Sequence, residues 1–473
     1  MADIVSVGID IGTSTTQVVF SRLTMENAAG YFAVPRVSIV DKQVIYKGQV
    51  HTTPLKSPVL IDGAGVREIV AREYGRAGFC PADVETGAVI ITGESARKEN
   101  AAAVLSELSG FAGDFVVSTA GPDLESIIAG KGSGAWRCSL EEDCVAVNLD
   151  IGGGTTNIVA FDCGETVSTG CLDVGGRLIR LGEDLTVQSI SPAAAAVAAD
   201  LELELAVGGR TSLPTLRKIT DRMADLLARA LGLKPEDELL RHVRTPGSSW
   251  FVPPRRVRRV CFSGGVADCI GRQGGEDVPY GDIGVLLGRS IAANPDLAAL
   301  PQLEAAETIR ATVVGAGTYT TTISGSTIDY VAELLPMKNL PVLKLTAGEE
   351  RRCYEGESRP LAEKIAWFRA QSGAERLVLA LEGLADPSYS QLKSAAAAIA
   401  DAWEASMPPD APVLVLVERD MAKALGFALR GRTARPVLAV DGIRAGQDDY
   451  VDFGRPLMDG MVIPAVVKTL LFG

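Results

Sequence analysis

The sequence has few aromatic residues and few of the side chains that usually bind transition metals. Phe, Trp and Tyr make up 5% of its 473 residues, too few for a platform on which nucleic-acid bases stack. The chain has 2 histidines and 8 cysteines, and no two cysteines form a C-x-x-C pair. We therefore expect no zinc or haem site, and instead reduced, mostly buried thiols in a reducing compartment.

Positive charge is also scarce. Lys and Arg number 46 against 59 Asp and Glu, which gives a net charge of −13. Proteins that bind nucleic acid or anionic membranes usually carry the opposite sign, so we expect neither partner. The chain lacks the ~18 consecutive apolar residues that span a bilayer, and its N-terminus lacks the basic stretch of a signal peptide. These absences predict a cytoplasmic protein.

What the sequence does contain is one motif in two copies. Two β-branched apolar runs, residues 4–20 and 144–161, each lead into Asp-Ile-Gly and then Thr-Thr. When Asp10 is aligned on Asp150, both copies read D-I-G-x-x-T-T-[QN]. An apolar run, glycines and a second apolar run predict a strand, a turn and another strand, here duplicated at the spacing of whole domains.

The rest of the chain alternates between predicted strands and helices. A strand, a Gly-Gly turn and a helix are expected over residues 255–270, and a β-α-β-α-β series is expected beyond residue 340. The tail, from about residue 452, is expected to form a strand or turn and then an apolar helix. This alternation predicts an α/β fold.

The residues of the two turns suit a phosphate group. Glycine has no Cβ, so backbone N–H groups at Gly12 and at residues 152–154 can approach a phosphate closely. The aspartates at the strand ends, Asp10 and Asp150, can hold Mg²⁺, chiefly through metal-bound waters, or orient an attacking water. One such motif is also typical of an ordinary tight turn, but two copies followed by Ser-Gly-Gly at 263–265 favour a nucleotide clamp. The turns also contain hydroxyl donors at Thr13, Ser14, Thr15, Thr155 and Thr156.

In this order, the two hairpins and the Ser-Gly-Gly segment resemble the actin-like ATPase superfamily. The sequence contains no G-x-x-x-x-G-K-[ST] loop that would cradle a phosphate instead. The resemblance implies an α/β fold with two ribonuclease-H-like lobes around a nucleotide cleft, plus a C-terminal α/β region. The implied boundaries are 1–143 for the first lobe, 144–338 for the second lobe with its adenosine loop, and 339–473 for the C-terminal region.

The resemblance also implies ATP or ADP with Mg²⁺ as cofactors. It assigns catalytic roles to Asp10, Asp150 and Glu125, and metal binding to Asp10 and Asp150. Glu125 begins a segment similar to a helix of the heat-shock chaperones, although a glutamate that only caps a helix would look the same. The implied nucleotide-binding residues are Gly12, Thr13, Ser14, Thr15, Gly152, Gly153, Gly154, Thr155, Thr156, Ser263, Gly264 and Gly265.

Within this superfamily the whole chain resembles the reactivating factors of ethanolamine ammonia-lyase, most clearly at residues 91–104, 118–135, 310–328 and 449–471. The resemblance implies a chaperone-like ATPase with slow hydrolysis and the lyase as partner. Such a factor releases damaged cobalamin from the inactivated lyase so that adenosylcobalamin can rebind. Association with a bacterial microcompartment and a homodimer both stay open.

Two other functions also stay open. An actin-fold kinase for a sugar or small acid would need a carboxylate base, for which Asp62, Asp83 and Asp114 are candidates. An ATP-dependent filament-forming protein would share the same fold. The lysine that positions the attacking water in the heat-shock chaperones has no clear equivalent; Lys98 is a candidate, but a solvated helix lysine would look the same.

Overall fold

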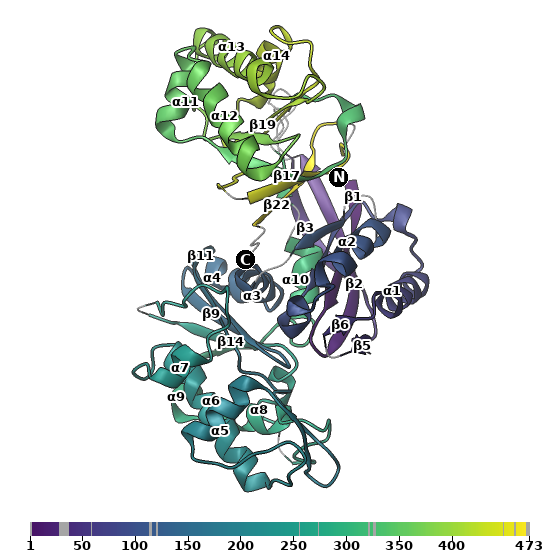
Figure 1. Cartoon of the computed structure of the whole chain (residues 1–473), viewed down its shortest axis with the longest axis vertical. Helices are drawn as coiled ribbons and strands as arrows, with labels where there is room; N and C mark the ends of the chain where they lie inside the picture. The colour runs from purple at the N-terminus through teal and green to yellow at the C-terminus, as the bar shows by residue number, and fades with distance from the viewer. Residues whose placement is uncertain are drawn as a thin grey trace.

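Three large β-sheets follow one another along the long axis of the molecule, each with helices packed against it (Figure 1). The structure is a computed structural model that describes residues 2–27, 37–57, 59–112, 116–119, 122–254, 256–272, 274–319, 322–324, 328–447, 449–457 and 460–469. In Figure 1 the C-terminal unit is at the top, the first lobe is below it on the right, and the second lobe extends to the bottom.

The first lobe is built on a sheet in the order β3-β2-β1-β7-β8, with the short β4 beside β2. Strand β2 runs antiparallel to β1, and β7 runs parallel to it. Along β1 the odd-numbered side chains pack toward α1 and α2, whereas the even side, at Gly8, packs against α10. This alternation buries the strand on both faces. The elements are β1 (Ala2–Ile11), β2 (Thr15–Asn27), β3 (Val37–Lys47), β4 (His51–Thr52), β5 (Leu55–Ser57), β6 (Leu60–Ile61), α1 (Gly63–Ala77), β7 (Thr86–Ile91), α2 (Ala101–Ala112) and β8 (Val116–Thr119).

The second lobe repeats this arrangement in the order β11-β10-β9-β14-β15. Its central strand β9 again lies between an antiparallel neighbour, β10, and a parallel one, β14. The largest apolar core fills the space between this sheet and helices α5, α6 and α8. The elements are α4 (Ala135–Glu141), β9 (Val145–Ile151), β10 (Thr156–Asp162), β11 (Glu165–Leu172), β12 (Ile179–Leu181), β13 (Val187–Ile190), α5 (Pro192–Asp200), α6 (Leu213–Ala230), α7 (Glu238–His242), β14 (Arg259–Ser263), α8 (Gly284–Ala293), α9 (Pro295–Ala298) and β15 (Gln302–Leu303). The duplicated strand order is that of the two-lobed actin-like ATPase fold, so the predicted fold class is confirmed.

Helices α3 (Pro122–Gly132) and α10 (Ala311–Tyr319) cross between the two lobes. Helix α3 packs on the sheet of the second lobe, and α10 packs on that of the first. A Cβ on Gly132 would lie 1.9 Å from the carbonyl oxygen of Ala311, and one on Gly315 would lie 2.1 Å from that of Ile128. The two backbones are therefore in direct contact, which only glycine allows at these positions.

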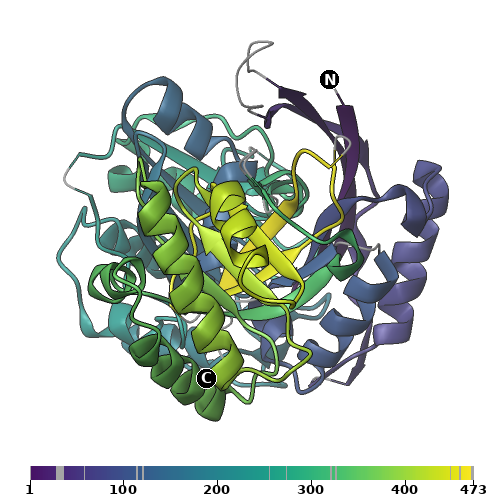
Figure 2. The ribbon, with the colours of Figure 1, turned by 90° about the horizontal axis from the view of Figure 1, so that it is seen from above.

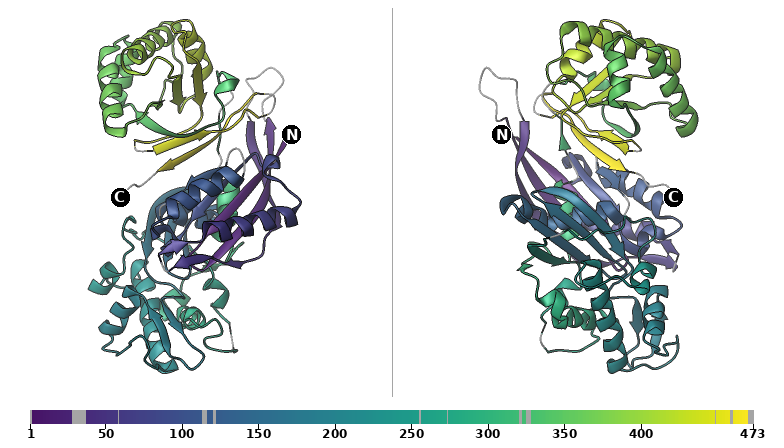
Figure 3. Two further views of the ribbon diagram at one scale, coloured as in Figure 1. Left: turned by 45° about the vertical axis from the view of Figure 1, so that its right-hand side comes forward. Right: turned by 90° about the vertical axis from the view of Figure 1, so that its left-hand side faces the viewer.

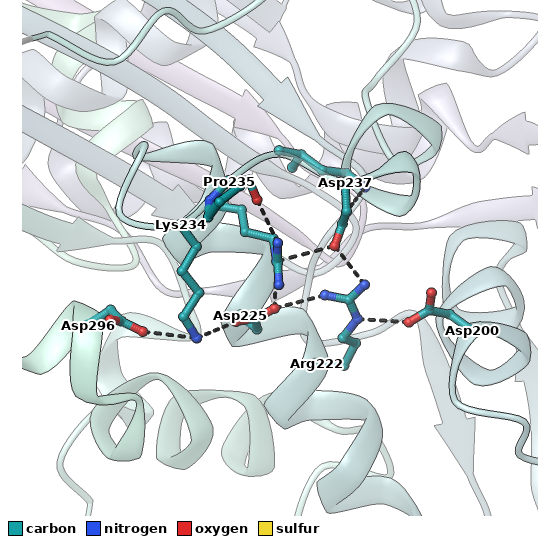
Figure 4. Close-up of polar contacts among 9 residues, drawn as sticks. Asp200, Arg222, Asp225, Lys234, Pro235, Asp237 and Asp296 are labelled. Carbon is teal, nitrogen blue, oxygen red and sulfur yellow. Dashed lines mark hydrogen bonds and ion pairs between the residues drawn. The ribbon is translucent and has the colours of Figure 1, made fainter.

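A network of charged side chains joins the helices of the second lobe (Figure 4). Arg222 of α6 donates to the carboxylates of Asp200, Asp225 and Asp237, each over 2.8 Å. Lys234 donates to Asp225 over 2.7 Å and so closes one side of the network. Isolated surface ion pairs contribute little to stability, but several half-buried charges in one network hold their helices in a fixed arrangement.

The C-terminal unit has a sheet in the order β16-β22-β21-β17-β18-β19-β20, with β17 to β20 parallel. It packs on the first lobe through Val462, which lies in one apolar cluster with Ile4 and Met25. Both views of Figure 3 show this unit stacked on the lobes, and in Figure 2, seen from above, it lies in front of them. The elements are β16 (Thr322–Ile323), β17 (Met337–Lys344), α11 (Ala347–Tyr354), α12 (Arg359–Ser372), β18 (Val378–Leu381), α13 (Tyr389–Ser406), β19 (Val413–Val417), α14 (Ala422–Arg430), β20 (Val437–Asp441), β21 (Asp449–Phe453) and β22 (Pro464–Thr469).

Two predictions of local structure were wrong. The tail does not form an apolar helix where it is described, because residues 464–469 are strand β22, paired with β21 and β16. After the Gly-Gly turn at 264–265 comes a single 3₁₀ turn, Ala267–Cys269, and the next α-helix begins only at Gly284.

The β-α-β-α-β series predicted beyond residue 340 is present, with two further helices, α11 and α12, before β18. The domain boundaries stay a prediction. No helix in the described ranges is long and apolar enough to cross a membrane.

Candidate functional site

A cleft of about 400 Å³ lies between the two lobes, where the duplicated turns meet. Of the predicted site residues, two stand behind its wall. Thr156 donates a hydrogen bond to the carbonyl oxygen of Val174 over 2.7 Å, and Ser263 donates one to Asp150. The other predicted residues line the cleft, although they lie up to 265 − 10 = 255 positions apart in the sequence. The predicted residues that line it are Asp10, Gly12, Thr13, Ser14, Thr15, Glu125, Asp150, Gly152, Gly153, Gly154, Thr155, Gly264 and Gly265.

The two turns have the same internal hydrogen bond. The N–H of Gly12 donates to the carbonyl oxygen of Thr15 over 2.8 Å, and the N–H of Gly152 donates to that of Thr155 over 2.9 Å. The turns are also neighbours, because a Cβ on Gly153 would lie 2.6 Å from Ser14 Oγ. Two glycine turns thus face each other across one narrow space, as expected for a clamp on a group with several oxygens.

An aspartate stands at the base of each turn with an equivalent hydroxyl partner. Thr92, which follows β7, donates to Asp10 Oδ1 over 2.9 Å, and Ser263, at the end of β14, donates to Asp150 Oδ1 over 2.6 Å. Burial raises the pKa of Asp10 to about 7; the Thr92 hydrogen bond offsets part of the rise, and the charge of Asp150 adds to it. Burial raises the pKa of Asp150 to about 6, against hydrogen bonds from Ser263 and Thr312. Both carboxylates are therefore costly to ionise without a nearby cation.

Glu125, in the first turn of α3, is the third carboxylate of the cleft. Burial, followed by the charges of Asp10 and Asp150, raises its pKa well above the usual range. Hydrogen bonds from the backbone of Gly93 and the side chain of Asn157 offset part of this effect. Three mutually repelling carboxylates are a set of hard oxygen ligands that favours Mg²⁺.

Polar atoms without partners also point to a ligand. Gln17 is paired with Asp10 across the first hairpin, and Asn157 is paired with Asp150 across the second. Within the described residues, Gln17 Oε1, Asn157 Oδ1 and Ser14 Oγ are buried without a hydrogen-bond partner, and all three side chains line the cleft. Buried polar atoms are normally satisfied, so the site fits a hydrated cation with an oxygen-rich ligand.

Sequence reasoning missed several residues of the cleft. Gln17 and Asn157 occupy the last position of the duplicated motif, so the repeat itself contained their signal. Thr92, Arg177 and Thr312 come from other segments that the strand order alone brings to the site. Among the described residues, Arg177 and Arg272 are the two cations that line the cleft, and Arg177 Nε lies 3.4 Å from Asp282 Oδ2.

Other candidates from the sequence lie elsewhere. Asp62 is the residue before α1, Asp83 lies in a 3₁₀ turn, and Lys98 follows another; none of them lines the cleft. Asp114 lies outside the described residues. The kinase hypothesis therefore gains no carboxylate base from Asp62 or Asp83.

Beyond the two turns, the lining of the cleft includes exposed residues. Gly264 and Gly265 line it, and so do Arg272 and Tyr280, both of which are exposed. Gly264 has a φ of +84°, and a Cβ there would lie 2.4 Å from the carbonyl oxygen of Ile151. A Cβ on Gly265 would make only an ordinary contact, with Ile309 at 3.8 Å. A flat group can therefore lie against this backbone, beside an exposed aromatic ring and a guanidinium.

Known proteins resemble the chain over its full length. Residues 2–473 match the family described as "Ethanolamine utilisation protein EutA". A protein of Salmonella typhimurium named ethanolamine ammonia-lyase reactivase EutA is 35% identical over 484 residues, covering 99% of this chain and 98% of its own length. The Escherichia coli protein of the same name is also 35% identical, with the same coverage.

Solved structures give weaker matches. Ethanolamine utilization protein EutJ from Carboxydothermus hydrogenoformans is 15% identical and covers 67% of this chain and 90% of its own, with a TM-score of 0.32. Component A of (R)-2-hydroxyglutaryl-CoA dehydratase from Acidaminococcus fermentans is 12% identical and covers 67% and 97%, with a TM-score of 0.34.

Proposed function

This chain belongs to the ethanolamine utilisation protein EutA family, and from that premise we propose that it reactivates ethanolamine ammonia-lyase by binding and hydrolysing ATP with Mg²⁺. In this proposal the protein loosens lyase that holds damaged cobalamin, the cobalamin leaves, and intact adenosylcobalamin replaces it. The names of the curated relatives support the choice of partner. We place this activity in the cytoplasm, where the eight free thiols would stay reduced.

The observation that carries the ATP-dependent part is the paired construction of the cleft. Backbone N–H groups and hydroxyls of residues 13–15 and 153–155 would donate to phosphate oxygens from opposite sides. Asp10, Asp150 and Glu125 would hold Mg²⁺ or its waters. The charge of the cation would offset the free-energy cost of keeping three ionised carboxylates buried close together. Bound ATP would supply the γ-phosphate, and Mg²⁺ would neutralise its charge. The wall at Gly264 and Gly265 would receive the adenosine.

A nucleotide switch also needs contacts that depend on how the lobes are arranged. Arg97 of the first lobe donates to Asp173 Oδ1 of the second lobe over 2.9 Å, so this pair crosses between them. The glycine crossing of α3 and α10 gives the lobes a common point about which to rotate. We propose that loss of the γ-phosphate loosens the contact between the turns, and that the lyase binds the two states with different free energies.

A reactivation assay tests the proposal. Ethanolamine ammonia-lyase is inactivated with cyanocobalamin and then given this protein, Mg²⁺, adenosylcobalamin and ATP, and ammonia release is followed. We expect recovery with ATP and none without it. Asp150→Ala should abolish recovery and ATP turnover, whereas Asp162→Ala, an exposed aspartate on the neighbouring strand β10, should leave both unchanged.

Three outcomes of this assay would each refute a different part of the proposal. ATP turnover without recovery would refute the lyase as partner while keeping the nucleotide site. Recovery that needs no ATP would refute the switch. Normal turnover in folded Asp150→Ala would refute the assignment of the cleft.

A further inference from the structure

Two cysteines and a glutamate converge at the junction of α4 and β9. Cys138 lies in α4, Glu142 is the residue after that helix, and Cys144 comes directly before β9. Their sulfur and carboxylate oxygen atoms all lie within 4.8 Å of one another. Both thiols are buried, at 7% and 6% exposure, while Glu142 is exposed. None of these residues lines the nucleotide cleft.

The backbone holds the three side chains in this arrangement. The N–H of Glu142 donates to the carbonyl oxygen of Cys138 over 2.9 Å, which ends the helix with the glutamate above the thiol. Asp143 then adopts a φ of +46°, which turns the chain back. The N–H of Cys144 donates to the carbonyl oxygen of Ser139 over 3.1 Å, and Ser139 Oγ donates to the carbonyl oxygen of Cys144 over 2.8 Å. The cluster is therefore built by the fold.

We propose that Cys138, Glu142 and Cys144 form a binding site for a thiophilic divalent cation, best satisfied by Zn²⁺. With a Zn–S distance of about 2.3 Å, tetrahedral ligands stand about 3.8 Å apart, so the cluster needs only a small contraction. The exposed side at Glu142 leaves the fourth position to water. Binding converts two thiols into two zinc-bound thiolates and releases two protons to solvent, with no change of oxidation state.

The neighbouring groups are consistent with this site. Arg259 Nη2 lies 3.0 Å from Glu142 Oε2, which orients the carboxylate and leaves Oε1 for the cation. Thiols carry their protons at neutral pH, so a bound cation displaces them. Mg²⁺, which prefers oxygen ligands, does not bind thiolates well enough to do so.

The site is separate from the nucleotide cleft. Cys144 precedes β9 and Asp150 lies near its end, six residues on, or about 20 Å along an extended strand. The cation would fasten α4 to the central strand of the second lobe. Because α4 follows α3, which carries Glu125, it would also fix the end of that helix. It has no direct part in phosphate chemistry.

The test uses the full-length, reduced protein after removal of metals. Free thiols are counted first, and Zn²⁺ binding is then measured by competition with a chromophoric chelator. Co²⁺ is titrated in a parallel sample, because thiolate ligands give Co²⁺ an intense near-ultraviolet charge-transfer band. With Mg²⁺ in excess to occupy the carboxylates of the cleft, we expect one equivalent of each cation and a charge-transfer band that Mg²⁺ does not change.

Matched variants locate the site. Cys138→Ser and Cys144→Ser should each lose the bound equivalent and the Co²⁺ band, and Glu142→Gln should bind roughly tenfold more weakly. Cys163→Ser, a nearby exposed thiol, and Cys80→Ser, an exposed thiol of the first lobe, should bind as the parent does.

Several results would overturn the proposal. These are no binding by the parent protein, a Co²⁺ spectrum without the thiolate band, an equivalent retained in both Cys138→Ser and Cys144→Ser, or an oxidised Cys138–Cys144 pair in the purified protein. If either serine variant fails to fold, the Co²⁺ spectrum of the parent and the affinity of Glu142→Gln still decide.

Discussion

Ser263 and Asp150 are paired residues on neighbouring parallel strands, and the Ser263 hydroxyl donates to Asp150 Oδ1 over 2.6 Å. The direction of this bond is fixed, because Asn148 Nδ2 donates to Ser263 Oγ over 3.0 Å and leaves the hydroxyl proton for the carboxylate. Thr312 Oγ1 donates to the other oxygen, Oδ2, over 3.3 Å. A buried relay of side chains thus favours the ionised form of Asp150.

Ser263→Ala should make Asp150 harder to ionise. Hydrogen bonds to a carboxylate favour its charged form, so their loss raises its pKa above the present value of about 6. One charged hydrogen bond is worth about 1.5 kcal/mol, or about one pH unit. We expect the acid limb of kcat/KM for ATP turnover to move up by about that amount. Thr312→Val, which removes a longer bond, should move it less. An acid limb that stays in place in a folded Ser263→Ala variant would contradict this role.

The raised pKa of Asp10 should also appear as a dependence of stability on pH in the protein without nucleotide and Mg²⁺. Its pKa is about 7 when folded and 3.8 in a solvated carboxyl group. Between these values the folded state binds more protons, so stability decreases as pH rises from about 4 to about 7. Each unit of difference corresponds to about 1.4 kcal/mol.

Asp10→Asn isolates this contribution in urea unfolding. The variant should match the parent near pH 3.5 and become more stable than it as pH rises, by about 4 kcal/mol near pH 8. Asp401→Asn, an exposed aspartate on α13, serves as control and should follow the parent at both pH values. A difference between Asp10→Asn and the parent that does not change with pH would mean that Asp10 is not strained by burial.

The duplicated motif predicted the two hairpins and their glycine turns because it is local. A strand, a turn and the next strand are contiguous in sequence, and the Asp-to-Gln and Asp-to-Asn pairs follow directly from the hairpin register. Thr92 could not be found in this way. It reaches Asp10 only because β7 lies parallel to β1, and that choice of neighbour is made by packing of the whole sheet.

The predicted helix in the tail was wrong for a related reason. The apolar run that ends the chain has the composition of either a buried helix or a strand, and periodicity does not separate the two in so short a segment. Residues 464–469 form a strand because β21 offers them a free edge to pair with. The proposed metal ligands Cys138 and Cys144 likewise could not be recognised from the sequence. They are brought together by the turn at Asp143, and their spacing matches no common metal-binding motif.

Gly265→Val should weaken nucleotide binding without disturbing the fold. A Cβ at Gly265 meets only Ile309, at 3.8 Å, so the added side chain projects into the cleft. Gly264 is unsuitable for this test because its φ of +84° and the 2.4 Å approach to Ile151 would strain the backbone. We expect calorimetry to give a roughly tenfold rise in Kd for ATP, about 1.4 kcal/mol. Gly348→Val on α11, which meets open space, is the control; an unchanged Kd in Gly265→Val would remove this wall from the site.

Glu73→Gln should destabilise the first lobe, because the fully buried Glu73 carboxylate accepts hydrogen bonds from Tyr46, His51, Arg76 and the backbone of Gln49. Burial alone would raise its pKa, but these hydrogen bonds hold the pKa below the usual range. The charged acceptor therefore stabilises the fold at neutral pH, and this contribution is lost as pH falls through the lowered pKa. A neutral amide satisfies fewer donors, so we expect a loss of about 2 kcal/mol in urea unfolding at pH 7. Glu68→Gln, on the exposed face of α1, the helix that also contains Glu73, should change the free energy of unfolding little. An equal loss of stability in the two variants would show that Glu73 is not the centre of this cluster.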